Sequence, residues 1–168
     1  LVVEEPVVGT APSQANGVTV RANISDTESD AHSPVGLWLS YDRSKQPSSV
    51  IAIKVASDGT LFGIVAAGIY HGETHPEAYC SRCSDKTLSG NYGIGHNEEV
   101  LGKSVLWSFS KSGDKWKHGM LLHVRSGTVY PTTLALRADG SIMDVTVHAG
   151  FFSKTVQWKR LDKDAFLK

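Results

Sequence analysis

Apolar and polar residues alternate with a period of two along most of the chain after residue 35. Ile51, Ile53 and Val55 share one face of such a segment, and the same period recurs around Leu61 and Tyr130. This alternation is typical of strands that bury one face. It predicts strands at about 35–41, 48–57, 60–70, 102–110, 115–124, 128–137, 141–149 and 152–160.

Short glycine-containing turns separate most of these segments. Asp58-Gly59, Ser112-Gly113-Asp114, Ser126-Gly127 and Asp139-Gly140 can each provide the positive φ that tight hairpins need. Eight strands joined mostly by hairpins predict an all-β fold, an antiparallel up-and-down barrel. A barrel of this size either fills with its own side chains or holds one small ligand. A β-sandwich is the alternative, and the near absence of long crossovers disfavours it.

Two residues at opposite ends of the predicted barrel point to its closure. Trp38 follows Gly36 near the start of the first strand, and Arg160 ends the last strand. The first and last strands of a barrel must pair to remove its open edges. We therefore expect the Trp38 ring to plug one end of the barrel, with Arg160 lying over it as a cation on an aromatic face.

The chain divides into a polar N-terminal extension, residues 1–34, and a barrel domain, residues 35–168. Residues 18–24 alternate weakly and predict an edge strand. We leave open whether the extension packs on the barrel or on a second copy, which would make a homodimer. The chain does not begin with Met, which a removed signal peptide would explain.

Charge and hydropathy exclude two classes of partner. Lys+Arg and Asp+Glu number 17 each, and no dense basic patch favours nucleic acid. No apolar run reaches the length of a transmembrane helix.

A long connection at about 71–101 interrupts the hairpins and contains both cysteines. Cys80 and Cys83 predict a local disulfide if the protein is exported to an oxidising compartment. The main alternative is a zinc site, in which the two cysteines and His71, His75 or His96 would complete a tetrahedron. A redox dithiol is disfavoured because no helix N-terminus is evident to lower the thiol pKa.

The predicted interior is amphiphilic and contains no ordered catalytic motif. If Thr132 faces inward, Tyr130 and Leu134 share its face, and we expect the neighbouring strand to turn Asp144 and His148 the same way. No Gly-x-Ser-x-Gly pattern is present, so we expect no enzyme. The alternative is that Asp144 and Lys154 pair on the outer surface, because a one-residue slip exchanges the faces. The candidate cavity residues are Val65, Tyr130, Thr132, Leu134, Asp144, His148 and Lys154.

Several short motifs, in order and spacing, resemble a family of small exported bacterial proteins catalogued as a domain of unknown function. They include Gly36-x-Trp38, Asp58-Gly59-Thr60-Leu61-Phe62-Gly63, Cys80-x-x-Cys83, Trp116-x-x-Gly119 and Thr155-x-x-Trp158-x-Arg160. The resemblance covers about residues 35–161. It implies a lipocalin-like, calycin-type barrel and a secreted or periplasmic location.

A lipocalin-like barrel suggests non-catalytic binding or transport of a small hydrophobic or amphiphilic molecule, with no cofactor. Two other functions stay open. One is a structural or protein-interaction module whose barrel is filled by its own side chains. The other is a zinc-binding protein that uses the loop from 71 to 96.

Overall fold

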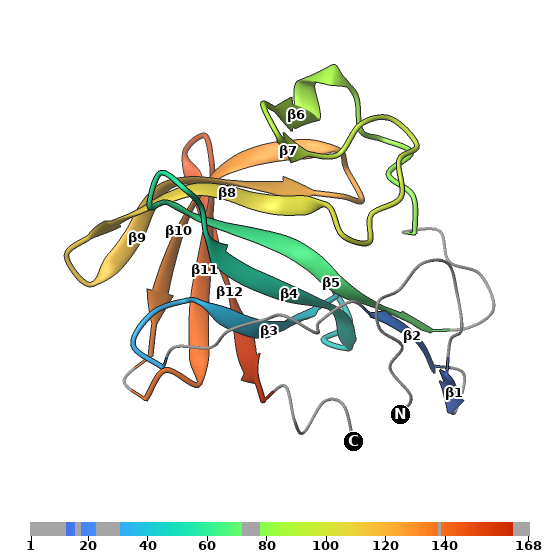
Figure 1. Cartoon of the computed structure of the whole chain (residues 1–168), viewed down its shortest axis with the longest axis horizontal. Helices are drawn as coiled ribbons and strands as arrows, with labels where there is room; N and C mark the ends of the chain where they lie inside the picture. The colour runs from blue at the N-terminus through green and yellow to red at the C-terminus, as the bar shows by residue number, and fades with distance from the viewer. Residues whose placement is uncertain (1–12, 16–17, 23–30, 72–77, 138, 163–168) are drawn as a thin grey trace.

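The computed structural model describes residues 13–15, 18–22, 31–71, 78–137 and 139–162, which are almost entirely β-sheet (Figure 1). One short 3-10 helix, Asp85–Thr87, occurs in this described part. The strands are β1 (Ser13–Ala15), β2 (Val18–Ala22), β3 (Gly36–Tyr41), β4 (Pro47–Val55), β5 (Leu61–His71), β6 (Leu88–Ser89), β7 (Tyr92–Gly93), β8 (Ser104–Ser112), β9 (Lys115–His123), β10 (Thr128–Leu136), β11 (Ile142–Ala149) and β12 (Phe152–Leu161).

Eight of these strands close into one antiparallel barrel. The hydrogen-bonded order runs β3, β4, β5, β8, β9, β10, β11, β12, and β12 pairs back with β3. The observed strand ends differ from the predicted ones by at most two residues. The predicted eight-stranded up-and-down barrel is therefore confirmed, and the sandwich alternative is wrong.

Two of the ladders that complete the barrel are short. Strands β12 and β3 share three residue pairs, centred on Arg160 and Trp38. Strands β5 and β8 also share three pairs, with register shifts between them. The β11–β12 hairpin, by contrast, pairs eight residues of each strand. The barrel is therefore one antiparallel sheet closed on itself, and its two shortest ladders, called the seams below, are β3–β12 and β5–β8.

Aspartates stabilise two of the predicted hairpin turns. Asp58 Oδ1 accepts hydrogen bonds from the hydroxyl and the backbone N–H of Thr60, at 2.7 and 3.0 Å. These bonds favour the ionised carboxylate and lower the pKa of Asp58. Asp139 makes the same two bonds with Ser141, and its pKa is lowered for the same reason. Gly59 and Gly140 follow these aspartates with φ of 85° and 76°.

Trp38 seals one end of the barrel, where β3 and β12 meet. Its side chain is completely buried, and the indole Nε1 donates a hydrogen bond to the carbonyl oxygen of Pro34 at 2.7 Å. The guanidinium carbon of Arg160 lies 4.4 Å from the centre of the Trp38 ring. The contact expected from the sequence is present, and it forms between residues directly opposite each other in the ladder.

Arg160 also ties the chain entering β3 to the turn before β11. Its three guanidinium nitrogens donate hydrogen bonds of 2.7–2.8 Å to three backbone carbonyls. Because the planar fork points in fixed directions, one side chain can satisfy three separate acceptors. The accepting carbonyls belong to Ser33, Val35 and Gly140.

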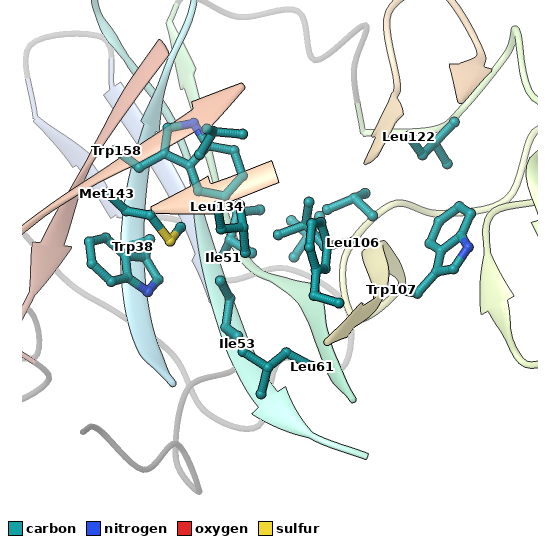
Figure 2. Packing of buried hydrophobic residues seen from close by; sticks show 14 of the residues in the cluster. Trp38, Ile51, Ile53, Leu61, Leu106, Trp107, Leu122, Leu134, Met143 and Trp158 are labelled. Atoms are coloured by element: carbon teal, nitrogen blue, oxygen red, sulfur yellow. The ribbon is translucent and has the colours of Figure 1, made fainter. Parts of the chain in front are cut away.

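The interior above this seal is filled with apolar side chains. Leu134, Met143 and Val145 are fully buried, and Met143 pairs with Trp158 across the β11–β12 ladder. Figure 2 shows Trp38, Met143, Leu134 and Trp158 gathered at one side of the cluster, and Trp107 well away from them. The sealed half of the barrel is therefore a packed apolar core.

A second apolar layer lies on the outer face of β3, β4 and β5. It consists of the buried residues Leu37, Val50, Ala52, Ala66 and Ala67. Leu37 alternates with the inward-facing Trp38, so the two clusters lie on opposite faces of the same strand. Both faces of this part of the wall are therefore excluded from water.

The N-terminal extension contributes two further strands to the sheet. The edge strand predicted at 18–24 corresponds to β2, which pairs antiparallel with the end of β5. Strand β1 then pairs with β2 at the sheet edge. The remainder of the extension, for which packing on a second copy was left open, lies mostly outside the described residues.

Candidate functional site

The end of the barrel opposite Trp38 contains a cavity of about 540 Å³. In an up-and-down barrel alternate turns lie at the same end, so the turns β3–β4, β9–β10 and β11–β12 surround this mouth (Figure 1). The lining residues come from these turns and from the adjoining inner faces of the strands. They include Ser40, Tyr41, Asp42, Arg43, Ser49, Ile51, Val65, Tyr70, Leu121, Arg125, Tyr130, Val147, Phe152, Lys154, Val156 and Trp158.

The floor of the cavity is apolar. Ile51, Val65 and Trp158 line it, and their exposed fractions are 3%, 5% and 8%. Ile51 and Val65 are partners in the β4–β5 ladder, where Gly63 lies two residues further along. A Cβ on Gly63 would lie 3.0 Å from side-chain carbons of Ile51 and Leu106. The glycine therefore lets these large side chains pack closely beneath the cavity.

The rim of the cavity is polar and mostly cationic. Arg43, Arg125 and Lys154 line it together with one carboxylate, that of Asp42. Asp42 Oδ1 accepts backbone hydrogen bonds from Ser44 and Gln46, at 2.8 and 3.1 Å. This carboxylate is therefore used to hold the β3–β4 turn.

Three of the predicted cavity residues line the cavity. Val65 is on the floor, Tyr130 is on the β10 wall, and Lys154 is near the mouth on β12. Thr132 and Leu134 share the inner face with Tyr130 but lie deeper, and they are 2% and 0% exposed. They belong to the packed core beneath the cavity.

The predicted inward orientation of Asp144 and His148 is wrong. The β10–β11 register places Leu134 opposite Val145, so the odd-numbered residues of β11 face inward. Asp144 instead forms an ion pair with Arg137 at 3.2 Å on the outer surface. The alternative pairing of Asp144 with Lys154 is also wrong, because these two side chains lie on opposite faces of the sheet.

His148 belongs to the same outer surface. Its ring nitrogens lie within hydrogen-bond distance of the Thr133 and Ser153 hydroxyls, at 3.1 and 3.0 Å. Thr146 is an outer-face neighbour and exchanges a hydroxyl hydrogen bond of 2.8 Å with Thr155. A polar ladder thus covers the outside of β10 to β12.

Sequence reasoning missed the turn residues that surround the mouth. Arg43 and Arg125 lie in two different hairpin turns and both line the cavity. The signal that could have found them is topological, because alternate hairpins of an up-and-down barrel share one end. Trp158, which lines the floor, was also not selected as a cavity residue.

The described part of the long connection packs on the outside of β8 and reaches the β9–β10 turn, where Cys80 Sγ lies 3.6 Å from the carbonyl oxygen of Val124. Tyr92 stacks on Trp107 with ring centres 6.3 Å apart, and Phe62 contacts Tyr92 at 5.6 Å. Cys80 and Cys83 are joined in a disulfide and are almost completely buried against the barrel. The disulfide therefore belongs to the outer packing of the barrel wall.

With both sulfurs in the disulfide, neither cysteine supplies a thiolate ligand to a metal ion. His96 Nδ1 lies 3.1 Å from the carbonyl oxygen of Cys83. His75 and the side chain of His71 lie outside the described residues. Across the described ranges, no three His, Cys, Asp or Glu side chains converge in a geometry suited to a metal ion.

Glu98 organises the end of the connection. One carboxylate oxygen accepts the backbone N–H of Gly95 at 2.6 Å, and the other accepts Lys103 Nζ at 3.2 Å. The hydrogen bond from Gly95 contributes most to lowering the pKa of Glu98 from its ordinary value. The hydrogen bond from Lys103 and the positive charge of that residue lower it further.

Similarity to known proteins defines the fold and the family. The described residues contain no helix that is both long and apolar enough to span a bilayer. Comparison with curated proteins yields no match. A solved structure entitled "Protein HP1028 from the human pathogen Helicobacter pylori belongs to the lipocalin family" is similar, with a TM-score of 0.63 and 17% identity over 80% of this chain and 86% of that one.

The family match covers most of the barrel. Residues 36–160, from the glycine that opens β3 to the arginine of the Trp38 contact, match the family described as "Uncharacterized protein conserved in bacteria (DUF2147)". The match includes every strand of the closed barrel and stops at the N-terminal extension. The chain therefore belongs to this bacterial family, and its barrel is lipocalin-like.

Proposed function

We propose that this protein binds and carries a small amphiphilic or hydrophobic molecule in its barrel, without catalysis. The observation that carries the proposal is the cavity of about 540 Å³, which combines an apolar floor with a polar rim. Small-molecule sites have volumes in this range and a similar division between apolar walls and a few polar groups. The similar Helicobacter pylori protein is described as a lipocalin, which supports the same type of use.

The sealed end limits the side from which a ligand can enter the cavity. Trp38 and Arg160 close the barrel beneath the core, so a ligand would enter from the opposite end. Its apolar part would bury surface against Ile51, Val65 and Trp158. Removing apolar surface from water supplies roughly 25 cal/mol per Å², which makes the floor the main source of affinity.

We also propose that the protein works outside the cytoplasm, in the periplasm or as a secreted protein. The Cys80–Cys83 disulfide supports this location, because structural disulfides persist in oxidising compartments.

Native mass spectrometry of the purified protein, combined with extraction of co-purifying lipids, tests the binding function. A panel of amphiphiles is then screened by thermal unfolding. A true ligand should stabilise the protein by about 2.7 kcal/mol at a hundredfold excess over its dissociation constant. Val65→Phe should fill the floor and abolish this stabilisation, whereas Val55→Phe, at a position 59% exposed, should leave it intact.

The rival function is a structural or protein-interaction module. If no ligand co-purifies and the whole panel leaves the melting temperature unchanged, the binding function is wrong and the rival gains support.

A further inference from the structure

We infer that the cavity selects amphiphiles with an anionic head, which Lys154 and Arg43 hold at the mouth. The inference rests on the proposed binding function and names the chemical class of its ligand. It is based on the charged side chains that line the cavity and on the partners that some of them already have.

The charges of the described residues at the mouth are unbalanced. Among them, Arg43, Arg125 and Lys154 line the cavity with one carboxylate, that of Asp42. That carboxylate already accepts two backbone N–H groups of its own turn. Arg125 already has an interaction partner, so the cations that bear on the inference are Arg43 and Lys154. The chain as a whole is neutral, with 17 basic and 17 acidic residues, so a local cationic excess is a property of this site. A cleft lined by one sign of charge attracts ligands of the opposite sign.

Two other exposed cations near the barrel have carboxylate partners. Lys103 pairs with Glu98 and Arg137 pairs with Asp144, both at 3.2 Å. Within the described ranges, neither an ion-pair nor a hydrogen-bond partner is found for Lys154. Its ammonium group therefore retains its donors for a ligand.

Lys154 also lies on an unusual face for a lysine. It occupies the inner face of β12 between Phe152 and Val156, opposite Val147 in the β11–β12 ladder. All four of these residues line the cavity. A lysine in such a row places its apolar stem along the wall and its charge at the water boundary. An anionic head at the mouth would meet this charge while the tail lies on the apolar floor.

Arg43 approaches the same mouth from the other side of the β3–β12 seam. Strand β3 ends at Tyr41, whereas β12 continues from the seam to Phe152, beyond the last pair with β3. The β3–β4 turn therefore lies beside the part of β12 that extends beyond the ladder with β3, and Arg43 and Lys154 both line the cavity. A guanidinium and an ammonium at one mouth can both bind the same carboxylate or phosphate.

Four probes with the same decyl chain test the charge preference: decanoate, decyl phosphate, decanol and decyltrimethylammonium. Isothermal titration calorimetry is run below their micellar concentrations, at low and at high salt. We expect the two anions to bind about tenfold more tightly than decanol at low salt, as charged hydrogen bonds imply. The advantage should shrink as salt screens it.

Lys154→Met removes the charge while keeping a long apolar side chain. It should reduce the affinity for decanoate about tenfold and leave decanol unchanged. Lys159→Met is the matched control, because Lys159 lies on the same strand but is exposed and faces outward. This control should behave like the wild type with all four probes. Circular dichroism verifies that both variants are folded.

The outcomes separate the inference from the function on which it rests. If decanol binds as tightly as decanoate, and Lys154→Met changes neither, the anion preference is wrong and the binding function stands. If no probe binds, both are wrong. In a last experiment, vesicles of phosphatidylglycerol replace free decanoate. Co-sedimentation with vesicles in the absence of monomer binding would overturn the cavity site and place the anion preference at a membrane surface.

Discussion

Replacing Arg160 with Met tests how the sealed end of the barrel is held. In the native protein the guanidinium lies 4.4 Å from the Trp38 ring centre. It also donates three hydrogen bonds to backbone carbonyls from two separate segments. Met preserves much of the side-chain volume and apolar contact but removes the charge and every donor.

The expected loss follows from these contacts. A hydrogen bond from a charged donor contributes roughly 1.5–3 kcal/mol when buried, and partial exposure of Arg160 reduces this to about 1 kcal/mol each. The contact with the indole face adds about 1 kcal/mol. Methionine recovers part of the packing, so we expect a net destabilisation of about 3 kcal/mol.

Urea unfolding followed by circular dichroism measures this loss, with Lys159→Met as the neighbouring exposed control. Arg160→Lys keeps the charge but cannot reproduce the planar fork, so it should lie between Met and the wild type. The denaturant slope should stay constant, since the barrel itself is unchanged. A double-mutant cycle with Trp38→Leu, which removes the aromatic ring, measures the coupling between the two side chains, expected at about 1 kcal/mol.

A value for Arg160→Met within about 0.5 kcal/mol of the control would refute the reasoning, because surface substitutions have effects of that size. It would mean that the seal depends on Trp38 packing alone.

Three further predictions concern other parts of the wall. Gly119→Ala should destabilise the protein by about 1–3 kcal/mol in urea unfolding, because the new Cβ would overlap the Phe109 ring. A stability equal to that of the wild type would show that the ring moves aside. Replacing Cys80 and Cys83 together by Ser should cost about 2 kcal/mol, as expected for a short disulfide loop, and thiol titration of the unfolded, unreduced wild type should detect no free thiol. The lowered pKa of Glu98 means that its stabilisation is present above the unfolded pKa and is lost as the pH falls through the folded one. Glu98→Gln should therefore flatten the acid side of the stability profile, and an unchanged profile would contradict this role.

The fold could be predicted because its signals are local. Alternation within each strand and glycine in each turn depend on neighbouring residues only, and hairpins leave little freedom in the order of strands. The seal was predictable for a different reason. Trp38 and Arg160 stand at the two ends of the run, and closure of a barrel requires those ends to meet.

The inner face of β11 was predicted wrongly, although the pattern of the strand itself indicates the observed face. Met143, Val145 and Val147 alternate with Asp144 and His148, so one face is uniformly apolar and the other carries polar groups. A slip of one residue exchanges the two faces, and the register expected from the sequence placed the polar set inside. In the structure the backbone N–H of Arg137 donates to the carbonyl oxygen of Ile142 at 2.8 Å, and Leu136 then pairs with Met143.

The two short seams give the barrel unequal mechanical resistance around its circumference. Each seam holds three residue pairs, against eight in the β11–β12 hairpin, so local opening costs least along the seams. Amide protons at the seams should therefore exchange with solvent before those of the long ladders. Toward the mouth β12 continues beyond its last pair with β3, so these two strands can move apart there while their ladders with β11 and β4 stay intact. A molecule larger than the resting entrance could then pass without unfolding the barrel that receives it.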